Sequence, residues 1–403
     1  MRISNSRFID SREKSMESAR VSRLRRIAYS ALAGVFLAGV AAAADPEFVG
    51  SERCGACHQD AYKTWKQSYH AKMVRPKDEA ILKDVVEQWD KGGPSKINLT
   101  GAPARLDDVV YVVGSFWKQR FLVKNAATGG HLFLDKQWNR VVKRWENYGN
   151  KNDWDTNCGT CHSTGFRLTS YDEKNPAAQK WSTSEFNVGC ETCHGPGAKH
   201  AKSLKKADIY AFAGKPKAEQ TRVCGYCHIR AENEKYLTPQ GNPSEHMPHP
   251  EVGKTWQPGE DWTKWYPEHV IIPGVQAEDK IDAVYKGDLG GMFKLDEISK
   301  QHGFYDGAKH HQQYQEFLQS KHYTRDVLSC SDCHSAHAGK KPMIVARDTC
   351  KQCHDASFTV DKFMPGTGQT VNDLFVRTHT FNKNQSRPQQ TTASGEPEYY
   401  NKK

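Results

Sequence analysis

The chain has 403 residues and a formal net charge of +10, and 37% of its residues are hydrophobic. Residues 1–44 hold eight Lys or Arg and three Asp or Glu, so the remaining chain carries a net charge of only +5. So small a surplus does not support nucleic-acid binding. The low apolar content also falls short of the core that a chain of this length normally buries.

The N-terminal segment predicts export. Arginines at 20, 23, 25 and 26 precede the apolar run 27–40, which ends in four alanines before Asp45. A basic region, a short apolar stretch and small residues at the cleavage site are typical of a secretory signal peptide. The apolar run is shorter than a membrane-spanning helix normally requires. We therefore expect a signal peptide at 1–44 and a mature chain in the periplasm or at the cell surface, without a membrane span. A retained N-terminal anchor is the alternative.

Six copies of the pattern C-x-x-C-H follow, and they use every cysteine of the chain. The cysteines are Cys54, Cys57, Cys158, Cys161, Cys190, Cys193, Cys224, Cys227, Cys330, Cys333, Cys350 and Cys353. The motif histidines are His58, His162, His194, His228, His334 and His354. In this pattern both thiols bind a c-type haem covalently and the histidine ligates its iron. We therefore predict six covalent c haems, with no cysteine left for a disulfide, a zinc site or a catalytic thiol.

Six haems would supply the missing apolar interior, and their propionates would bring the oxidised protein near neutrality. We expect a mainly α fold with much irregular loop, wrapped round a chain of haems, with one small antiparallel β insertion at about 108–145. The expected parts are a first haem with a β flap (45–150), a central trio (151–230), a loop and helix insert (231–325), a terminal haem pair (326–380) and a disordered polar tail (381–403).

A repeated segment predicts two distal haem ligands. Residues 62–70 and 314–322 both fit the pattern Tyr-x-x-aromatic-x-Gln-Ser-x-His without a gap. The tyrosine and the aromatic residue lie on one side of a helix, so we read each segment as a short helix that packs on a haem and delivers its histidine. A surface helix with an incidental histidine is the alternative. A helix over 309–323 would place His311 and His322 on the same side.

Residues 108–145 contain short β-branched and aromatic runs at 109–113, 120–123 and 131–134, separated by glycines. We interpret them as a flap over the first haem, with a substrate surface as the alternative. The later insert holds the loose histidines His246, His249, His269, His302, His310 and His311, and a second helix is expected at 277–285.

Twelve histidines outside the motifs are available for six distal positions. The predicted distal set is His70, His200, His311, His322, His337 and His379. His337 follows His334 too closely to reach the far side of the same haem, so it should ligate a neighbouring one. His200 likewise suits an adjacent haem. His310 is the alternative to His311, and Met73, Met247 and Met364 are alternative axial ligands.

Three segments, 188–200, 62–70 and 330–337, resemble multihaem cytochromes of the cytochrome c-554 type. The resemblance runs from about Val49 to Asp355, and it implies stacked and perpendicular haem pairs with mainly bis-histidine ligation. The family includes a tetrahaem carrier of electrons from hydroxylamine oxidation. Because this chain has six motifs, neither a partner nor a five-coordinate haem carries over from the tetrahaem members.

The leading functional hypothesis is electron transfer through closely packed haems, since a haem with both axial sites filled has no place for a substrate. The expected partners are other cytochromes or a quinol-oxidising membrane complex. One alternative is an oxidoreductase with one open haem acting on a small nitrogen or sulfur compound, for which Lys235, Tyr236 and His269 are candidate residues. Another is a protomer of an extracellular cytochrome filament. We assign no catalytic residue.

Overall fold

The computed structural model describes residues 47–115, 117–230, 233, 235–244, 247–267, 305–307, 310–337, 349–371 and 374–381. The predicted signal peptide, the expected helix at 277–285, the polar tail from 382 onward and His246, His269 and His302 lie outside the described residues. No described helix is long and apolar enough to cross a membrane.

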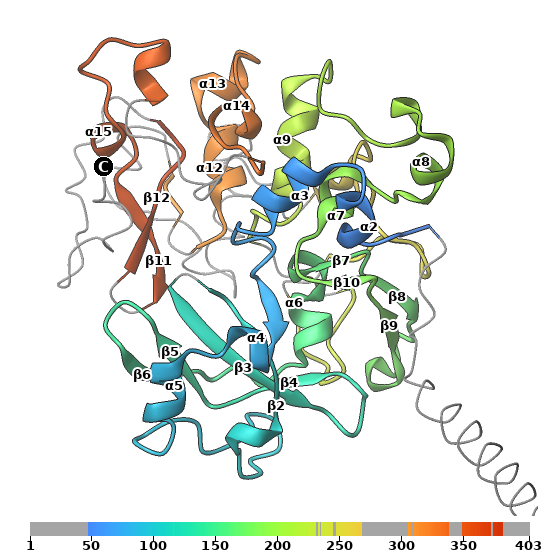
Figure 1. Ribbon diagram of the computed structural model, residues 1–403, viewed down its shortest axis with the longest axis vertical. Coiled ribbons are helices and arrows are strands. Elements are labelled where there is room, and N and C mark those ends of the chain that lie inside the picture. Colours follow the sequence, from blue (N-terminus) through green and yellow to red (C-terminus); the bar gives the residue numbers. More distant parts are fainter. Residues whose placement is uncertain are drawn as a thin grey trace, which may run out of the picture. The chain divides into compact units, whose positions relative to one another are not determined.

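A six-stranded antiparallel sheet forms the lower part of the view in Figure 1. Its strand order is β1-β2-β3-β5-β6, with β4 paired to β3. The strands are β1 (Val74–Pro76), β2 (Val109–Val113), β3 (Lys118–Lys124), β4 (His131–Phe133), β5 (Lys136–Asn139) and β6 (Arg144–Asn147). The three predicted apolar runs thus form β2, β3 and β4, and the sheet extends beyond the predicted insertion at both ends.

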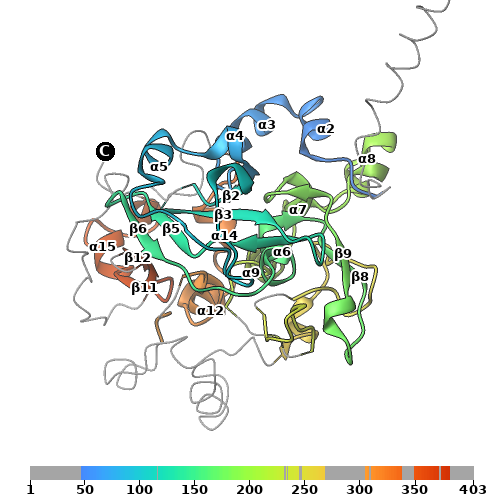
Figure 2. The ribbon, with the colours of Figure 1, turned by 90° about the horizontal axis from the view of Figure 1, so that it is seen from below.

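Alternation along β3 gives the sheet two apolar faces. Phe121 and Val123 pack with Val85 and Trp89, beneath the helices α4 (Lys77–Ala80) and α5 (Lys83–Gln88). Leu122 points the other way and packs with Trp154, the first residue of α6. Figure 2 shows α4 and α5 on one side of the sheet and α6 on the other. The sheet is therefore a buried platform for the helix that carries the second motif.

The other strands in the described part of the chain form three two-stranded antiparallel ladders. They are β7 (Ser163–Thr164) with β10 (Glu185–Phe186), β8 (Arg167–Ser170) with β9 (Lys180–Ser182), and β11 (Gly366–Val371) with β12 (Leu374–Arg377). The prediction of a single small β insertion therefore underestimated the number of strands and sheets. These strands are too short for their sequences to show a clear alternation of apolar and polar residues.

The helices are short, and five of them contain cysteines of the attachment motifs: α2 (Ser51–Gly55), α6 (Trp154–His162), α7 (Cys190–His194), α9 (Lys217–Gly225) and α14 (Cys330–Cys333). The sixth motif begins in the 3-10 turn Thr349–Gln352. Besides α4 and α5, the other described helices are α3 (Gln59–Trp65), α8 (Ala198–Ser203), α12 (Gln313–Leu318), α13 (Lys321–Thr324) and α15 (Val360–Phe363). Further 3-10 turns are Leu106–Asp108, Pro176–Ala178, Lys206–Asp208 and Trp262–Lys264.

The predicted helix at 309–323 is instead broken into α12 and α13. His311 precedes α12 in a left-handed conformation, with φ at 58°. Helix α12 ends at Leu318, and the side chain of Ser320 caps the start of α13. Since a left-handed residue cannot continue an α-helix, His311 and His322 do not share one helix face.

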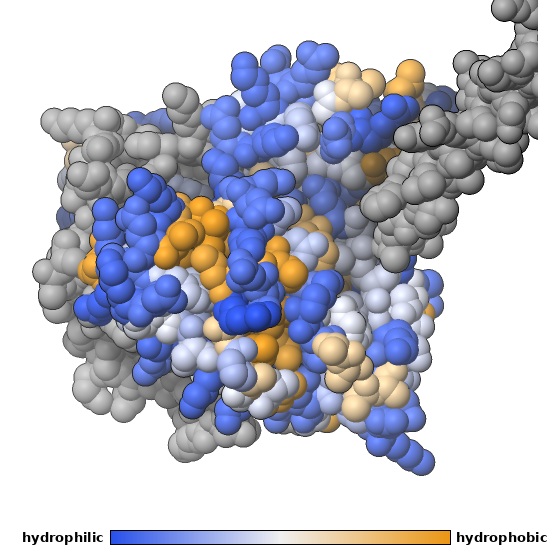
Figure 3. Space-filling view, turned by 60° about the horizontal axis from the view of Figure 1, so that its bottom comes forward, coloured by the Kyte–Doolittle hydropathy of each residue, from blue (hydrophilic) through white to orange (hydrophobic). Residues whose placement is uncertain are grey.

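A second apolar cluster surrounds α9 and α12, and it is rich in aromatic residues. Tyr226 stacks on Trp256 with ring centres 4.3 Å apart, and Tyr314 packs against the fully buried Trp262. On the face turned forward in Figure 3, hydrophobic side chains form small patches between larger hydrophilic areas. The apolar residues of this chain are thus spread over several small clusters rather than one large core.

Candidate haem-binding site

Each attachment motif forms one tight turn that gathers its three functional side chains. In the first motif the amide of His58 donates to the carbonyl of Cys54 at 2.9 Å. The same bond joins His228 to Cys224, His334 to Cys330 and His354 to Cys350, at 2.9–3.0 Å. Residues four apart lie on the same side of a helical turn. The C-x-x-C-H spacing therefore presents two thiols and one imidazole to one side.

All six motifs open into one continuous cavity of about 2840 Å³. Ligand pockets usually measure roughly 300–1,000 Å³, so this cavity has room for several large groups. Its lining includes cysteines from every motif and all six motif histidines. The twelve cysteines form no disulfide. The chemistry of this donor set and the size of the cavity both fit covalently bound haems.

Five motif histidines face a second histidine across this cavity at nearly the same distance. The pairs and ring-centre separations are His58 and His200 at 6.1 Å, His228 and His70 at 6.3 Å, His194 and His337 at 6.0 Å, His354 and His322 at 6.1 Å, and His334 and His379 at 6.1 Å. An imidazole nitrogen lies about 2 Å from a bound metal ion and about 1 Å from its ring centre, so two imidazoles on one iron have ring centres about 6 Å apart. The five separations therefore fit an iron between each pair.

Hydrogen bonds to the chain orient several of these rings. The Nδ1 atoms of His194, His200 and His379 lie 2.9–3.1 Å from the carbonyl oxygens of Tyr210, Lys205 and Arg377 respectively. A carbonyl partner requires a proton on Nδ1 and leaves Nε2 as the ligand atom. The chain thus sets the tautomer that an iron ligand needs.

The repeated segment acts in the same way in both copies. The ring of Tyr62 packs on Gly55 in the first motif, and the ring of Tyr314 packs on Gly225 in the fourth, where a side chain in place of either glycine would collide with the ring. Ser68 accepts a bond from the amide of Ala71 at 3.2 Å, and Ser320 accepts one from Tyr323 at 3.2 Å. The serine closes a turn that holds the histidine two residues later, in each case opposite a motif histidine.

One glutamate of the third motif joins three parts of the site. Glu191, which is 3% exposed, accepts hydrogen bonds from the amides of Val49, Gly50 and Gly197 at 2.7–2.9 Å. Val49 and Gly50 precede the helix of the first motif, and Gly197 precedes the helix that carries His200. The same carboxylate therefore positions His58 and the histidine that faces it.

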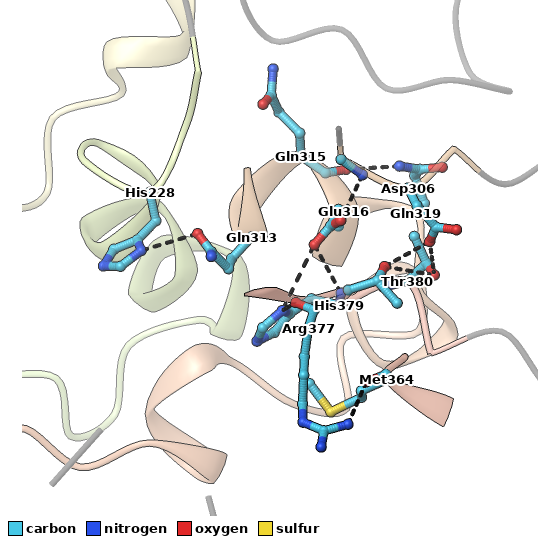
Figure 4. A network of polar contacts seen from close by, with 12 residues as sticks. His228, Asp306, Gln313, Gln315, Glu316, Gln319, Met364, Arg377, His379 and Thr380 are labelled. Carbon is cyan, nitrogen blue, oxygen red and sulfur yellow. Dashed lines mark hydrogen bonds and ion pairs between the residues drawn. The ribbon is translucent and has the colours of Figure 1, made fainter. Parts of the chain in front are cut away.

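Side chains of α12 hold two other histidines in place (Figure 4). Gln313 contacts Nδ1 of His228 at 3.3 Å. Glu316, which is 4% exposed, accepts the amide of His379 at 2.9 Å and that of Gly307 at 2.7 Å. This short helix thus supports the fourth motif and the partner of the fifth.

Cysteines of different motifs lie side by side and show the order of the motifs in space. The side chain of Cys54 neighbours that of Cys190, Cys224 neighbours Cys330, and Cys227 neighbours Cys161. Electrostatic contacts join Cys193 to Cys224 and Cys333 to Cys350. The motifs therefore run in the order first, third, fourth, fifth and sixth, and the second branches from the fourth.

The second motif differs from the others. Among the described residues, no histidine ring faces His162 at the separation of the five pairs, and its buried Nδ1 has no hydrogen-bond partner there. Burial, with smaller effects from the charges of Arg120 and Lys118, lowers the pKa of His162 to about 4. His311 is the remaining member of the predicted distal set. It has His162 among its electrostatic neighbours and packs on His310 with ring centres 4.0 Å apart.

Lys118 and Arg120 belong to β3, the central strand of the predicted flap. Both are electrostatic neighbours of His162, so this strand lies near the second motif. Nothing in the sequence selects these two cations, because polar residues at alternate positions occur in any half-buried strand. Among the residues suggested for an open haem, Lys235 and Tyr236 do not line the cavity.

The three alternative methionine ligands differ in position. Met247 is 1% exposed within the aromatic cluster and does not line the cavity. Met73 and Met364 line it, and Met73 packs beside the apolar face that contains Trp154.

A buried acidic cluster begins the helix of the second motif. Asp153 caps α6 through the amide of Asp155 at 3.1 Å, and it accepts bonds from Thr128 and Asn125. Asp155 in turn contacts Nδ1 of His131 at 3.0 Å. Burial, with a smaller effect from the Asp155 charge, raises the pKa of Asp153 to about 7.

We expect Asp153→Asn to reduce the loss of stability that accompanies a rise in pH from about 4 to about 7. Because the folded pKa lies above the unfolded value of 3.8, this group's stabilisation is complete below about pH 4 and is lost as pH rises through about 7. The shift corresponds to at most about 4 kcal/mol, and asparagine keeps the cap oxygen. Urea midpoints at pH 5 and pH 8 measure the effect, with exposed Asp172→Asn as the control. Equal pH dependence in wild type and Asp153→Asn would contradict this assignment.

Comparison with known proteins finds a family model that matches part of this chain. The family model described as cytochrome c554 and c-prime matches residues 53–92 and 131–195. These stretches hold the first three motifs and His70. The predicted resemblance to the c-554 type is confirmed.

The fold of this chain is similar to that of a solved structure. The outer cell wall cytochrome OcwA, 20% identical in sequence, aligns over 83% of this chain and 80% of its own, with a TM-score of 0.54. An undecahaem cytochrome from the S-layer of Carboxydothermus ferrireducens aligns over 79% of this chain and 44% of its own at 16% identity, with a TM-score of 0.38 that is too low to support an argument.

One curated relative is an enzyme. The dissimilatory sulfite reductase MccA of Wolinella succinogenes is 25% identical over 213 residues, which cover 38% of this chain and 30% of MccA. The match thus spans less than a third of that protein.

Proposed function

We propose that this chain is an exported hexahaem c-type cytochrome that transfers electrons through closely packed haems, five of them with bis-histidine ligation. The five histidine pairs at 6.0–6.3 Å carry this proposal. The distal ligands are then His200, His70, His337, His322 and His379. An iron with two imidazole ligands has no vacant position for a substrate, so its chemistry is electron transfer.

The cofactor supplies the one-electron chemistry, and the chain supplies ligands, spacing and burial. The partners are redox proteins, either other cytochromes or a quinol-oxidising membrane complex. Export to the periplasm or the cell surface agrees with the outer cell wall location in the name of OcwA. Assembly into a filament stays a prediction.

The intact mass of the purified protein tests the haem count and the export together. We expect a chain that begins near Asp45 and carries six haem masses, because each of the six motif turns presents two thiols to the cavity. Five or fewer haems after complete maturation would contradict the hexahaem assignment, and a chain retaining Met1 or Met16 would contradict removal of the signal peptide.

A second candidate function has one observation in its favour. The haem of the second motif has no facing histidine at pairing distance among the described residues, so its iron is a candidate for an open coordination site. We propose that this haem acts on a small nitrogen or sulfur compound, with electrons from the fourth motif. The name of the relative MccA, a sulfite reductase, agrees with such a reaction.

A further inference from the structure

One phenylalanine packs on the facing histidines of two successive motifs. The ring centre of Phe381 lies 4.9 Å from that of His322 and 5.9 Å from that of His379, and both contacts are edge-on, with interplanar angles of 89° and 85°. These separations are typical of edge-to-face ring contacts. His322 faces the sixth motif histidine and His379 faces the fifth. A single ring at the wall of the common cavity thus contacts two of the five facing histidines.

The backbone of Phe381 adopts a conformation that a phenylalanine disfavours. Its φ is 50°, in the left-handed region where a bulky residue is an outlier and glycine is favoured. Such strain persists only where surrounding contacts hold it. The preceding residues are held by the buried Asp306, which accepts the hydroxyls of Thr378 and Thr380 at 2.7 and 3.1 Å. Glycine would serve the turn alone better, so the ring is what this position requires.

The second copy of the repeated segment supports this ring. Phe317, the aromatic residue of that copy, packs on Phe381 with ring centres 6.2 Å apart and an interplanar angle of 79°. In the first copy Trp65 has the same place, and its indole nitrogen donates to the carbonyl oxygen of Val188 at 3.0 Å instead. The second copy thus uses its aromatic residue to back Phe381, which in turn contacts the histidine that ends the same copy.

The two histidine pairs differ in the angle between their rings. The rings of His322 and His354 are inclined at 74°, and those of His379 and His334 at 32°. An imidazole bound to iron can turn about its bond to the metal, and groups packed against it limit that rotation. The carbonyl oxygen of Arg377 restrains His379 as well. Among the described residues no hydrogen bond reaches the His322 ring, so Phe381 should restrain His322 more than His379.

We propose that Phe381 is a positioning residue that sets the ring orientation of both histidines and thereby links the ligand geometry of the fifth and sixth haems. This inference rests on the proposed bis-histidine ligation, which it deepens. The angle between two imidazole planes affects the low-spin signal and the potential of a haem, so one ring would adjust two haems together. The competing explanation is that Phe381 only fills apolar space beside α12.

Electron paramagnetic resonance of the oxidised holoprotein tests the proposal. His322→Ala and His379→Ala identify the two low-spin signals, since each variant should lose one of them. Phe381→Gly should shift or broaden both signals, with the larger change at the sixth haem and the haem content of wild type. Glycine suits a φ of 50°, so the turn itself is kept. Phe381→Leu keeps most of the apolar volume without the aromatic edge and should change the same two signals.

Carbon monoxide binding to the reduced protein gives the size of the effect. In Phe381→Gly the concentration that displaces the two histidines should fall about two- to tenfold, because the loss of one edge-to-face contact corresponds to a factor of that size. Phe381→Tyr keeps the ring edge and should retain the wild-type signals and the wild-type carbon monoxide affinity.

Two other phenylalanines provide matched controls. The ring of Phe358 stacks on that of His354 at 4.3 Å, and Phe212 lies edge-on to His194 at 5.9 Å. Phe358→Leu should therefore change only the signal of the sixth haem, and Phe212→Leu only that of the third.

The outcomes separate this inference from the proposed function. If the two histidine variants each lose one low-spin signal but Phe381→Gly and Phe381→Leu leave either signal unchanged, the positioning role is wrong and bis-histidine ligation stands. Equal changes in Phe381→Tyr and Phe381→Gly would also contradict the role of the ring edge. If neither His322→Ala nor His379→Ala alters a low-spin signal, the proposed ligation fails and the inference fails with it.

Discussion

His200→Ala should convert one of the six haems from low spin to high spin while leaving it covalently attached. The ring of His200 faces that of His58 at 6.1 Å and is oriented by the Lys205 carbonyl. Alanine has no ligand atom, so the iron between the two rings would keep one imidazole and gain an open position. The reduced variant should then bind carbon monoxide at one more iron than wild type does.

Electron paramagnetic resonance of the oxidised protein and carbon monoxide difference spectra measure this change. His249→Ala serves as the control, because His249 is a buried histidine that packs on Trp265 and does not line the cavity. An unchanged spin state in His200→Ala would show that another group ligates the first haem. His322→Ala extends the test to the last pair, opposite His354.

Glu191→Ala should destabilise the fold by about 3–5 kcal/mol, since it leaves three amide groups without their acceptor and each such loss costs about 1–3 kcal/mol. These amides belong to Val49, Gly50 and Gly197. Local relaxation and water reduce the sum. The damage should concentrate on the first haem, because Glu191 positions both sides of its histidine pair.

Denaturant midpoints followed by haem absorbance provide the measurement. Glu191→Gln keeps one acceptor oxygen and should lose less stability than Glu191→Ala. The exposed Glu52→Ala is the control for removing a negative charge near the same helix. A midpoint for Glu191→Ala within error of that control would show that the carboxylate does not hold these segments together.

The sequence predicts the local parts of the site well. The turn of each motif follows from a spacing of four residues between the first cysteine and the histidine, as the bond from His58 to Cys54 illustrates. The Tyr-x-x-aromatic-x-Gln-Ser-x-His pattern indicated a common role because each serine closes its own turn. Such features depend on neighbours in the chain.

Features that depend on distant segments could not be read from the sequence. His70 faces the fourth motif and His337 the third, and no local pattern specifies which histidine meets which. Glu191 occupies a position within its motif where any residue is allowed, so the sequence contains no indication of its hydrogen bonds to three distant amides. The helix expected to carry both His311 and His322 is absent, because its start depends on the left-handed residue at 311.

The branch at the fourth motif affects the route by which electrons would reach the second motif. Cys224 and Cys227 touch cysteines on either side of the line of motifs and also Cys161 of the second. Under the proposed electron-transfer function, an electron that enters at the first motif passes the third and fourth before the second, and one that enters at the sixth passes the fifth and fourth before the second. The second motif is thus the same number of steps away from the first motif as from the sixth. The haem of the second motif could therefore be reduced whether the electron donor docks at the first motif or at the sixth.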